Sequence, residues 1–96
     1  MIKHIVCFKL AEPTETACWR AKEVLLSMIG NVPMIRSIEV GLDLLHSPRS
    51  CDVCLIVTVD DREALQAYAD DPYHCNVVKT HMHAVCASSV TADYEF

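Results

Sequence analysis

The stretch Val53-Cys54-Leu55-Ile56-Val57-Thr58-Val59 decides the fold, because it carries no charge and is apolar at almost every position. Successive side chains of a strand point to opposite faces of a sheet, so a strand with one wet face alternates apolar and polar residues. This stretch is apolar on both faces instead. It therefore predicts a central strand with a neighbour on each side and cover on both faces.

The N-terminal stretch can supply one neighbouring strand, because residues 1–10 alternate with a period of two. Four apolar side chains share one face with His4, namely Ile2, Val6, Phe8 and Leu10. The opposite face carries Lys3, Ile5, Cys7 and Lys9. A histidine among apolar neighbours needs a hydrogen-bond partner or a cavity, so His4 is a candidate for either role.

After the first strand the pattern changes to a helical period. Apolar residues from Ala17 to Ile29 recur at i, i+4 and i+7, which is one helical stripe. Glu15 lies in the first turn, where the helix dipole favours an anion. Gly30-Asn31 is expected to end this helix as a left-handed cap. A second strand is then predicted from Met34 to Leu42, followed by a polar loop.

The C-terminal half predicts helical structure in two pieces and one more strand. Asp60-Asp61 precede a short helix expected over residues 64–69. Asp71-Pro72 is typical of an N-cap followed by a first-turn proline, so another helix should run from Pro72 to about His83. Residues 85–94 are predicted to form the last strand.

This order of elements is β-α-β-β-α-β, which predicts a ferredoxin-like α+β fold with one antiparallel four-stranded sheet. Both helical segments then lie on one face of the sheet. The other face is too apolar to stay wet, and the simplest cover for it is the same face of a second copy. We therefore expect a homodimer in which two sheets pair into an α/β barrel.

Composition limits the range of functions. A chain of 96 residues makes a single domain, residues 1–96. Thirteen acidic and eight basic residues give a net charge of −5 without a Lys/Arg cluster, which disfavours nucleic acid as a partner. No apolar run is long enough to predict a membrane span. The first ten residues lack the pattern of a signal peptide, so we expect a cytoplasmic protein.

The six cysteines favour reduced thiols over a disulfide framework in that compartment. Cys51 and Cys54 have C-x-x-C spacing, but they open a strand, whereas redox motifs of this type open a helix. A second C-x-x-C is missing, and His81 and His83 would point apart on a helix. We therefore predict no metal site, and the two glycines exclude a glycine-rich phosphate loop.

Four segments, in order, resemble the stress-responsive A/B barrel (Dabb) family. They are the strand Ile2 to Lys9, the proline-led strand Pro33 to Gly41, the L-x-x-Y and P-x-H segments from Leu65 to His74, and the closing Asp93-Tyr94. The resemblance covers the whole chain. It implies a dimeric α+β barrel with a cavity between sheet and helices, and for most members it implies no established activity.

One plant branch of this family consists of cyclases that close poly-β-keto chains by aldol condensation without a cofactor. The resemblance places the catalytic pair of that branch at Tyr68 and His74, with His4 lining the cavity. Phe8 shares the face of His4 and is expected in the same ligand pocket. Val53 is expected there too, although it stands where the cyclases carry a cavity-facing histidine. The Asp70-Asp71 pair also replaces the His-Pro of many relatives.

The residues themselves allow the same chemistry. His74 lies in the first turn of the Pro72 helix, with Val78, His81 and Val85 following on one α-helical stripe. A neutral imidazole there could act as a general base, and the Tyr68 phenol could stabilise an enolate. Packing in the hydrophobic core explains the presence of His74 and Tyr68 equally well.

Three functions therefore remain open. The first is binding of a small hydrophobic or carbonyl-containing ligand, with or without acid–base catalysis by His74 and Tyr68 and without a cofactor. The second is a non-catalytic, stress-related assembly protein in which the same histidines fill a core. The third is cofactor-independent monooxygenation of a small aromatic compound, which ferredoxin-like dimeric barrels often carry out.

Overall fold

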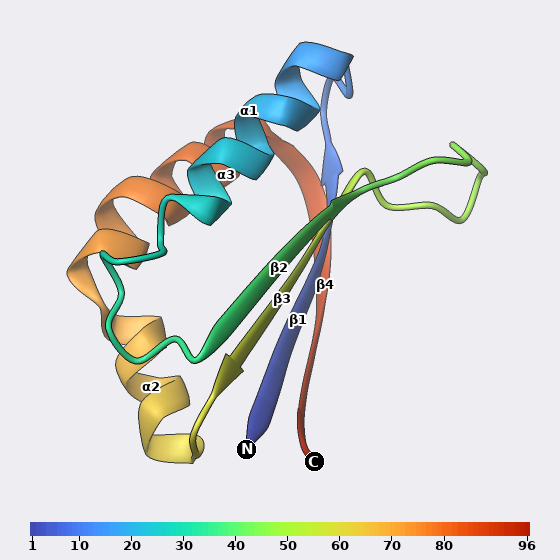
Figure 1. Ribbon diagram of the computed structural model, residues 1–96. Coiled ribbons are helices and arrows are strands. Elements are labelled where there is room, and N and C mark those ends of the chain that lie inside the picture. Colours follow the sequence, from blue (N-terminus) through green and yellow to red (C-terminus); the bar gives the residue numbers. More distant parts are fainter.

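The computed structural model describes residues 1–96, which form one antiparallel sheet with helices on one of its faces (Figure 1). The strands have the spatial order β2-β3-β1-β4. They comprise β1 (Ile2–Leu10), β2 (Ser37–Leu42), β3 (Val53–Val59) and β4 (Cys86–Glu95). The predicted ferredoxin-like α+β fold is thus confirmed, and the apolar stretch that predicted a central strand is β3, one of the two inner strands.

Strand register explains why β3 needs cover on both faces. On the helix-covered face β1 and β3 pair Ile2 with Val59, and Val6 with Leu55, and all four side chains are buried. On the open face Ile5 pairs with Ile56, and both side chains are only half-buried. The helices therefore complete the core on one face only.

The first helix, α1 (Glu15–Leu26), begins as predicted but ends one turn early. Thr14 Oγ1 accepts a hydrogen bond from the Ala17 N–H, which caps the N-terminus. At the C-terminus the Ser27 hydroxyl donates to the Val24 carbonyl, and it thereby competes with the backbone N–H groups that would continue the helix. The chain leaves α1 through turns, and Gly30 has the expected left-handed conformation, with φ of +81°.

Strand β2 also differs from its prediction, because it begins at Ser37 and not at Met34. Pro33 has no N–H to donate to a ladder. The next residues turn before joining the sheet, since the Ile35 N–H donates to the Val32 carbonyl. Regular pairing with β3 starts only after the Arg36 N–H donates to the Thr58 carbonyl at 2.8 Å.

The second helical region is broken where the sequence predicts. Helix α2 (Arg62–Asp70) starts two residues before the expected Ala64, because the side chain of Asp61 accepts from the Ala64 N–H and caps it. Asp71 then interrupts the helix and starts the next one. Its Oδ1 accepts from the backbone N–H groups of Tyr73 and His74, at 2.9 and 3.1 Å.

The helix that follows Asp71 contains a π-helical turn. Residues 72–73 are α-helical, the π-helix η1 covers His74–Val78, and α3 covers Lys79–Val85. A π-turn adds one residue, so every later side chain is shifted on the helix surface. Val85 still packs against the core and Nε2 of His81 is buried, so the predicted stripe stays on the inner side of the helix. The cavity, however, is lined by Lys79, Met82 and Cys86, which the α-helical stripe does not include.

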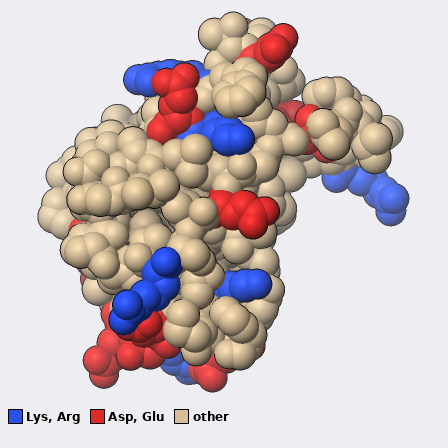
Figure 2. Space-filling model, in the orientation of Figure 1, with Lys and Arg blue, Asp and Glu red and all other residues tan.

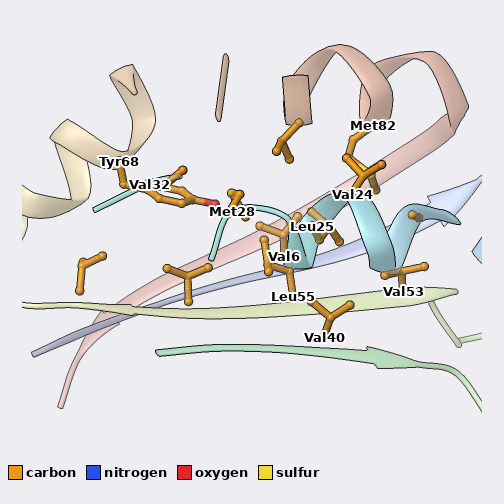
Figure 3. Close-up of a cluster of buried hydrophobic side chains, with 14 of the residues drawn as sticks. Val6, Val24, Leu25, Met28, Val32, Val40, Val53, Leu55, Tyr68 and Met82 are labelled. Carbon is orange, nitrogen blue, oxygen red and sulfur yellow. The ribbon is translucent and has the colours of Figure 1, made fainter. Parts of the chain in front are cut away.

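The core lies between the helices and the sheet (Figure 3). Strands β1 and β3 contribute every second side chain, and α1 contributes Ala21, Val24 and Leu25. The ring of Tyr68 lies in the same layer, with its hydroxyl oxygen directed into it (Figure 3). The hydrophobic core therefore extends to Tyr68, which belongs to the candidate site described below.

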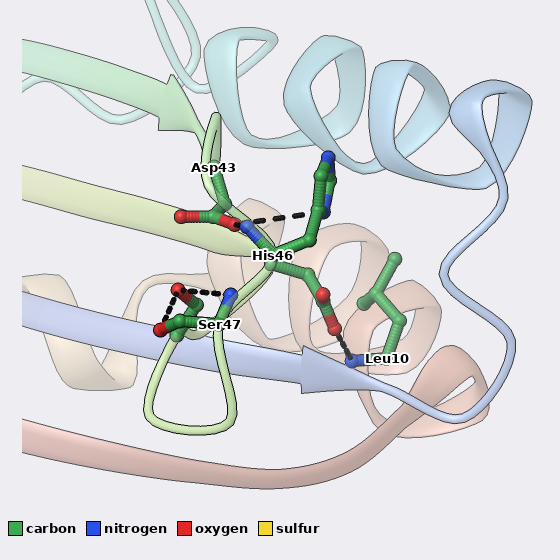
Figure 4. Close-up of polar contacts among 6 residues, drawn as sticks. Leu10, Asp43, His46 and Ser47 are labelled. Carbon is green, nitrogen blue, oxygen red and sulfur yellow. Dashed lines mark hydrogen bonds and ion pairs between the residues drawn. The ribbon is translucent and has the colours of Figure 1, made fainter.

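The connection between β2 and β3 projects away from the body of the domain (Figure 1). Asp43 accepts a hydrogen bond from the His46 N–H, and Ser47 and Ser50 bond to each other (Figure 4). At the base of this loop Asp52 Oδ2 accepts from the Leu10 N–H at 2.8 Å. The loop is therefore anchored to the end of β1.

Charges of both signs are interspersed over the surface seen in Figure 2, with no region of basic residues alone. This agrees with the absence of a basic cluster in the sequence. None of the helices has the length and apolar character to cross a membrane.

Candidate functional site

A cavity of about 730 Å³ lies between the helical region and the β1–β4 side of the sheet. Helix α1 packs over β2 and β3, so this side is covered by α2, η1 and α3 alone. Its apolar wall includes Ile2, Val6, Phe8, Leu65, Val78 and Met82. Its polar groups include His4, Tyr68, His74, Lys79, His83 and Asp93. The volume is that of a typical small-molecule site.

Three of the residues expected in the site are brought together in the cavity. The ring of His74 stacks on that of Tyr68, with centroids 4.3 Å apart and planes inclined by 29°. The ring of His4 meets the edge of Tyr68, with centroids 5.3 Å apart and planes inclined by 60°. Tyr68 therefore lies between two imidazoles that come from distant parts of the chain.

Two polar atoms of this group are buried without a hydrogen-bond partner. They are the Tyr68 hydroxyl and Nδ1 of His74, in residues that are only 2% and 8% exposed. An unsatisfied buried polar group costs about 1–3 kcal/mol of stability. Unsatisfied buried groups of this kind need an explanation, and the two rings that carry them line the cavity.

The surroundings keep both groups neutral. Burial lowers the pKa of His74 below its ordinary value, and the nearby Lys79 ammonium acts in the same direction. The backbone carbonyls of Ala69 and Tyr68 oppose this shift without reversing it. Burial raises the pKa of Tyr68, with a smaller contribution from Asp93. At neutral pH the imidazole can accept a proton, and the phenol can donate a hydrogen bond.

His4 is held by a partner that the sequence reasoning did not assign. Its Nδ1 lies 2.5 Å from Oδ1 of Asp93, which is directly opposite on β4. The register of β1 and β4 creates this contact, whereas the sequence motifs indicate Asp93 only as part of the closing Asp-Tyr pair. A carboxylate on this nitrogen fixes the ring orientation of His4 and favours one tautomer.

The other two residues expected in the ligand pocket have different positions. Phe8 lines the cavity from β1. Val53 pairs with Phe8 across the strands, but it is 0% exposed and belongs to the hydrophobic core, outside the cavity lining. The structure therefore does not bring Val53 to the site.

The cavity also contains charged groups that sequence reasoning missed. Lys79 and His83 line it from α3, and Arg62 lines it from α2. The π-helical turn brings the first two into the cavity, and composition or spacing gives no signal for such a turn. Arg62 forms an ion pair with Glu95 on β4, with 3.1 Å between Nε and Oε1.

The thiols lie outside this site, except for Cys86. Cys7 and Cys54 face each other across β1 and β3, and Cys51 lies beside them. Burial, with the neighbouring Cys7, raises the pKa of Cys54 to about 11. A thiol with that pKa is protonated at neutral pH and is a poor nucleophile. No three His, Cys, Asp or Glu side chains are grouped to hold a metal ion.

These features define a class, the ferredoxin-like α+β domains with a cavity between one sheet and its helices. The family model described as Stress responsive A/B Barrel Domain (Dabb) matches residues 2–96. The chain therefore belongs to this family, as the motifs of the sequence indicate.

Individual relatives agree with this assignment. An uncharacterized protein of Streptomyces coelicolor is 30% identical over 99 residues, which cover both chains completely. A dimeric protein of unknown function from Bacteroides fragilis has a similar structure, with a TM-score of 0.84 and 28% identity. The match covers 99% of this chain and 95% of that one.

A hydroxynitrile lyase from Passiflora edulis shares the fold at a lower level of identity. The TM-score is 0.77 and the identity 14%, over 97% of this chain and 90% of the lyase. Identity at this level shows the fold alone.

Proposed function

We propose that this protein binds a small carbonyl compound and moves a proton on it, with His74 as the general base and Tyr68 as the hydrogen-bond donor to the carbonyl oxygen. The observation that carries the proposal is the pair of unpartnered buried atoms, the Tyr68 hydroxyl and His74 Nδ1, on two stacked rings at one cavity wall. The mainly apolar remainder of the cavity suits an apolar carbon chain.

The proposed step is enolisation. The neutral imidazole of His74 accepts a proton from a carbon next to the carbonyl group, and the electron pair of that C–H bond forms a C=C bond. The carbonyl oxygen takes the negative charge, and the Tyr68 hydroxyl donates a hydrogen bond to it. Return of the proton from the imidazolium reverses the step, and attack of the enolate on a second carbonyl would form a carbon–carbon bond.

The environment supports these roles in two ways. The lowered pKa of His74 keeps the base unprotonated at neutral pH. The Tyr68 hydroxyl has no existing hydrogen bond to break before it donates to the substrate. His4 supports the edge of the Tyr68 ring and is itself oriented by Asp93. His4 is therefore a positioning residue in this proposal.

Deuterium exchange tests the chemistry directly. The probe is 4,6-dioxoheptanoate, whose C5 hydrogens lie between two carbonyl groups, and the loss of their ¹H signal is followed by NMR in D₂O. We expect faster exchange than in buffer with the wild-type protein, and exchange at the buffer rate with His74→Phe. Buffer-rate exchange with the wild type, or unchanged exchange with the variant, would show that the proposal is wrong.

We propose in addition that the open face of the sheet pairs with a second copy. Ile5 and Ile56 form an apolar pair at its centre, and Val90 of β4 is exposed on the same face. The Bacteroides fragilis protein with the same fold is dimeric, which supports the proposal. Two such sheets facing each other form the barrel.

A further inference from the structure

The π-helical turn gives the cavity a cation. The backbone N–H of Lys79 donates to the His74 carbonyl, five residues earlier, so the two residues lie one turn apart on the same side of the helix. In an uninterrupted α-helix Val78 would follow His74 at this place, and Lys79 would point away. Both Lys79 and His74 line the cavity.

Lys79 has no acidic partner within the protein. The other charged groups of the lining are paired, since Arg62 contacts Glu95 and Asp93 contacts His4. None of the five ion pairs of the structure involves Lys79, so no carboxylate lies within ion-pair distance of its ammonium group. Its ammonium group also lowers the pKa of the His74 imidazole, and both residues line the cavity.

We infer that the ligand carries a carboxylate, which pairs with the ammonium group of Lys79 while its carbonyl group reaches Tyr68 and His74. This inference rests on the proposed function and adds the substrate class to it, a keto acid. One helical turn corresponds to roughly 5 Å along the axis, which a short saturated chain between the carboxylate and the reacting carbon can span. Apolar side chains of β1 and α3, such as Val6 and Met82, would contact that chain.

A matched pair of ligands tests the role of Lys79. The acid 4,6-dioxoheptanoate and its methyl ester have the same carbon skeleton and differ in the negative charge. We expect the wild-type protein to bind the acid about three-fold more tightly than the ester, because Lys79 is exposed and an exposed ion pair contributes a factor of about this size. Dissociation constants are measured by NMR titration.

Three variants complete the design. Lys79→Met should bind acid and ester equally, with the affinity that the wild type has for the ester. Lys79→Arg should keep the preference for the acid. Lys22→Met is the control, because Lys22 lies on α1 against the Trp19 ring, outside the cavity lining, and the preference should not change. A preference that survives in Lys79→Met, or equal binding of both ligands to the wild type, would overturn the inference.

Deuterium exchange in the same samples separates this inference from the proposed function. Binding of the acid that depends on Lys79, without accelerated exchange, would retain the carboxylate site and overturn the acid–base proposal. Accelerated exchange that is equal for acid and ester would retain the acid–base proposal and overturn the carboxylate site. Failure of both ligands to bind would overturn the carboxylate site.

Discussion

The imidazole of His74 is stacked on the phenol ring of Tyr68, with 4.3 Å between the ring centroids, although α2 ends between these two residues. The break at Asp71 makes this contact possible, because it lets the chain restart a helix with His74 in its first turn. The stack therefore depends on a cap and on a helix break together. It combines a hydrogen-bond donor and a proton acceptor at one wall of the cavity.

Replacing His74 with phenylalanine should remove proton transfer and leave the fold intact. Phenylalanine keeps the stack on Tyr68 and removes Nδ1, which has no partner. The free energy of unfolding should stay within about 1 kcal/mol of the wild type, because the volume changes little. Urea unfolding measures stability, and NMR measures deuterium exchange. Loss of several kcal/mol without loss of binding would place His74 in the core instead.

Replacing Tyr68 with phenylalanine should also lower catalysis without lowering stability. The hydroxyl is buried and unpartnered, so its removal should leave the melting temperature unchanged or raise it. The exchange rate should fall about 10²-fold, which is typical for loss of one donor to a developing oxyanion. A variant that is less stable and equally active would contradict the role of Tyr68 as donor.

The stability of the protein should depend on the protonation of His74. Its folded pKa is lower than the ordinary 6.5, so the unfolded chain binds the proton first as the pH falls. The free energy of unfolding should therefore decrease as the pH falls from above 6.5 to the folded pKa, and this term should be constant below it. Urea unfolding at several pH values checks this, and His74→Phe should show a shallower dependence than the wild type.

Replacing Asp93 with asparagine should disturb His4 more than it disturbs the fold. The Asp93 side chain is 41% exposed, so the contact with His4 should contribute less than about 1 kcal/mol to stability. The tautomer of His4, observed by ¹⁵N NMR, should change, and exchange of the probe should slow. An unchanged His4 spectrum would show that the carboxylate does not orient the ring.

Replacing Ile56 with aspartate should produce a folded monomer. Ile56 is half-buried on the open face, opposite Ile5, and a charge there would prevent contact with a second copy. The wild type should sediment as a dimer at micromolar concentration, with an interface above ~1,200 Å². Asn76→Asp, at an exposed position of η1 in the helical layer on the other side of the sheet, is the control and should remain dimeric. A monomeric wild type would exclude the barrel.

The fold could be predicted from the sequence because its periodicities are local and strong. The two-residue alternation of β1, the apolar β3 and the Asp71-Pro72 cap each determine their own element. Helix α1 and strand β2 were mispredicted at one end each, where Ser27 and the residues after Pro33 form turns.

The candidate site could be predicted only in part, because some of its contacts depend on how the strands pair and not on the spacing of residues along the sequence. Motifs identified Tyr68, His74 and His4, which the structure brings together. Asp93 requires the pairing of β1 with β4, and Lys79 requires the π-helical turn. Val53 was expected at the pocket because of its place in a motif, but the packing of the helices buries it completely.

The pairing of β1 with β4 also determines when the cavity can form during synthesis. β1 is made before β4, and the contact between His4 and Asp93 joins residues 89 positions apart. Contacts between such distant residues slow folding, because a long loop must close before they form. A nascent chain that ends before β4 lacks one wall of the cavity, so under the proposed function a ligand could bind only after β4 has been made and has paired with β1.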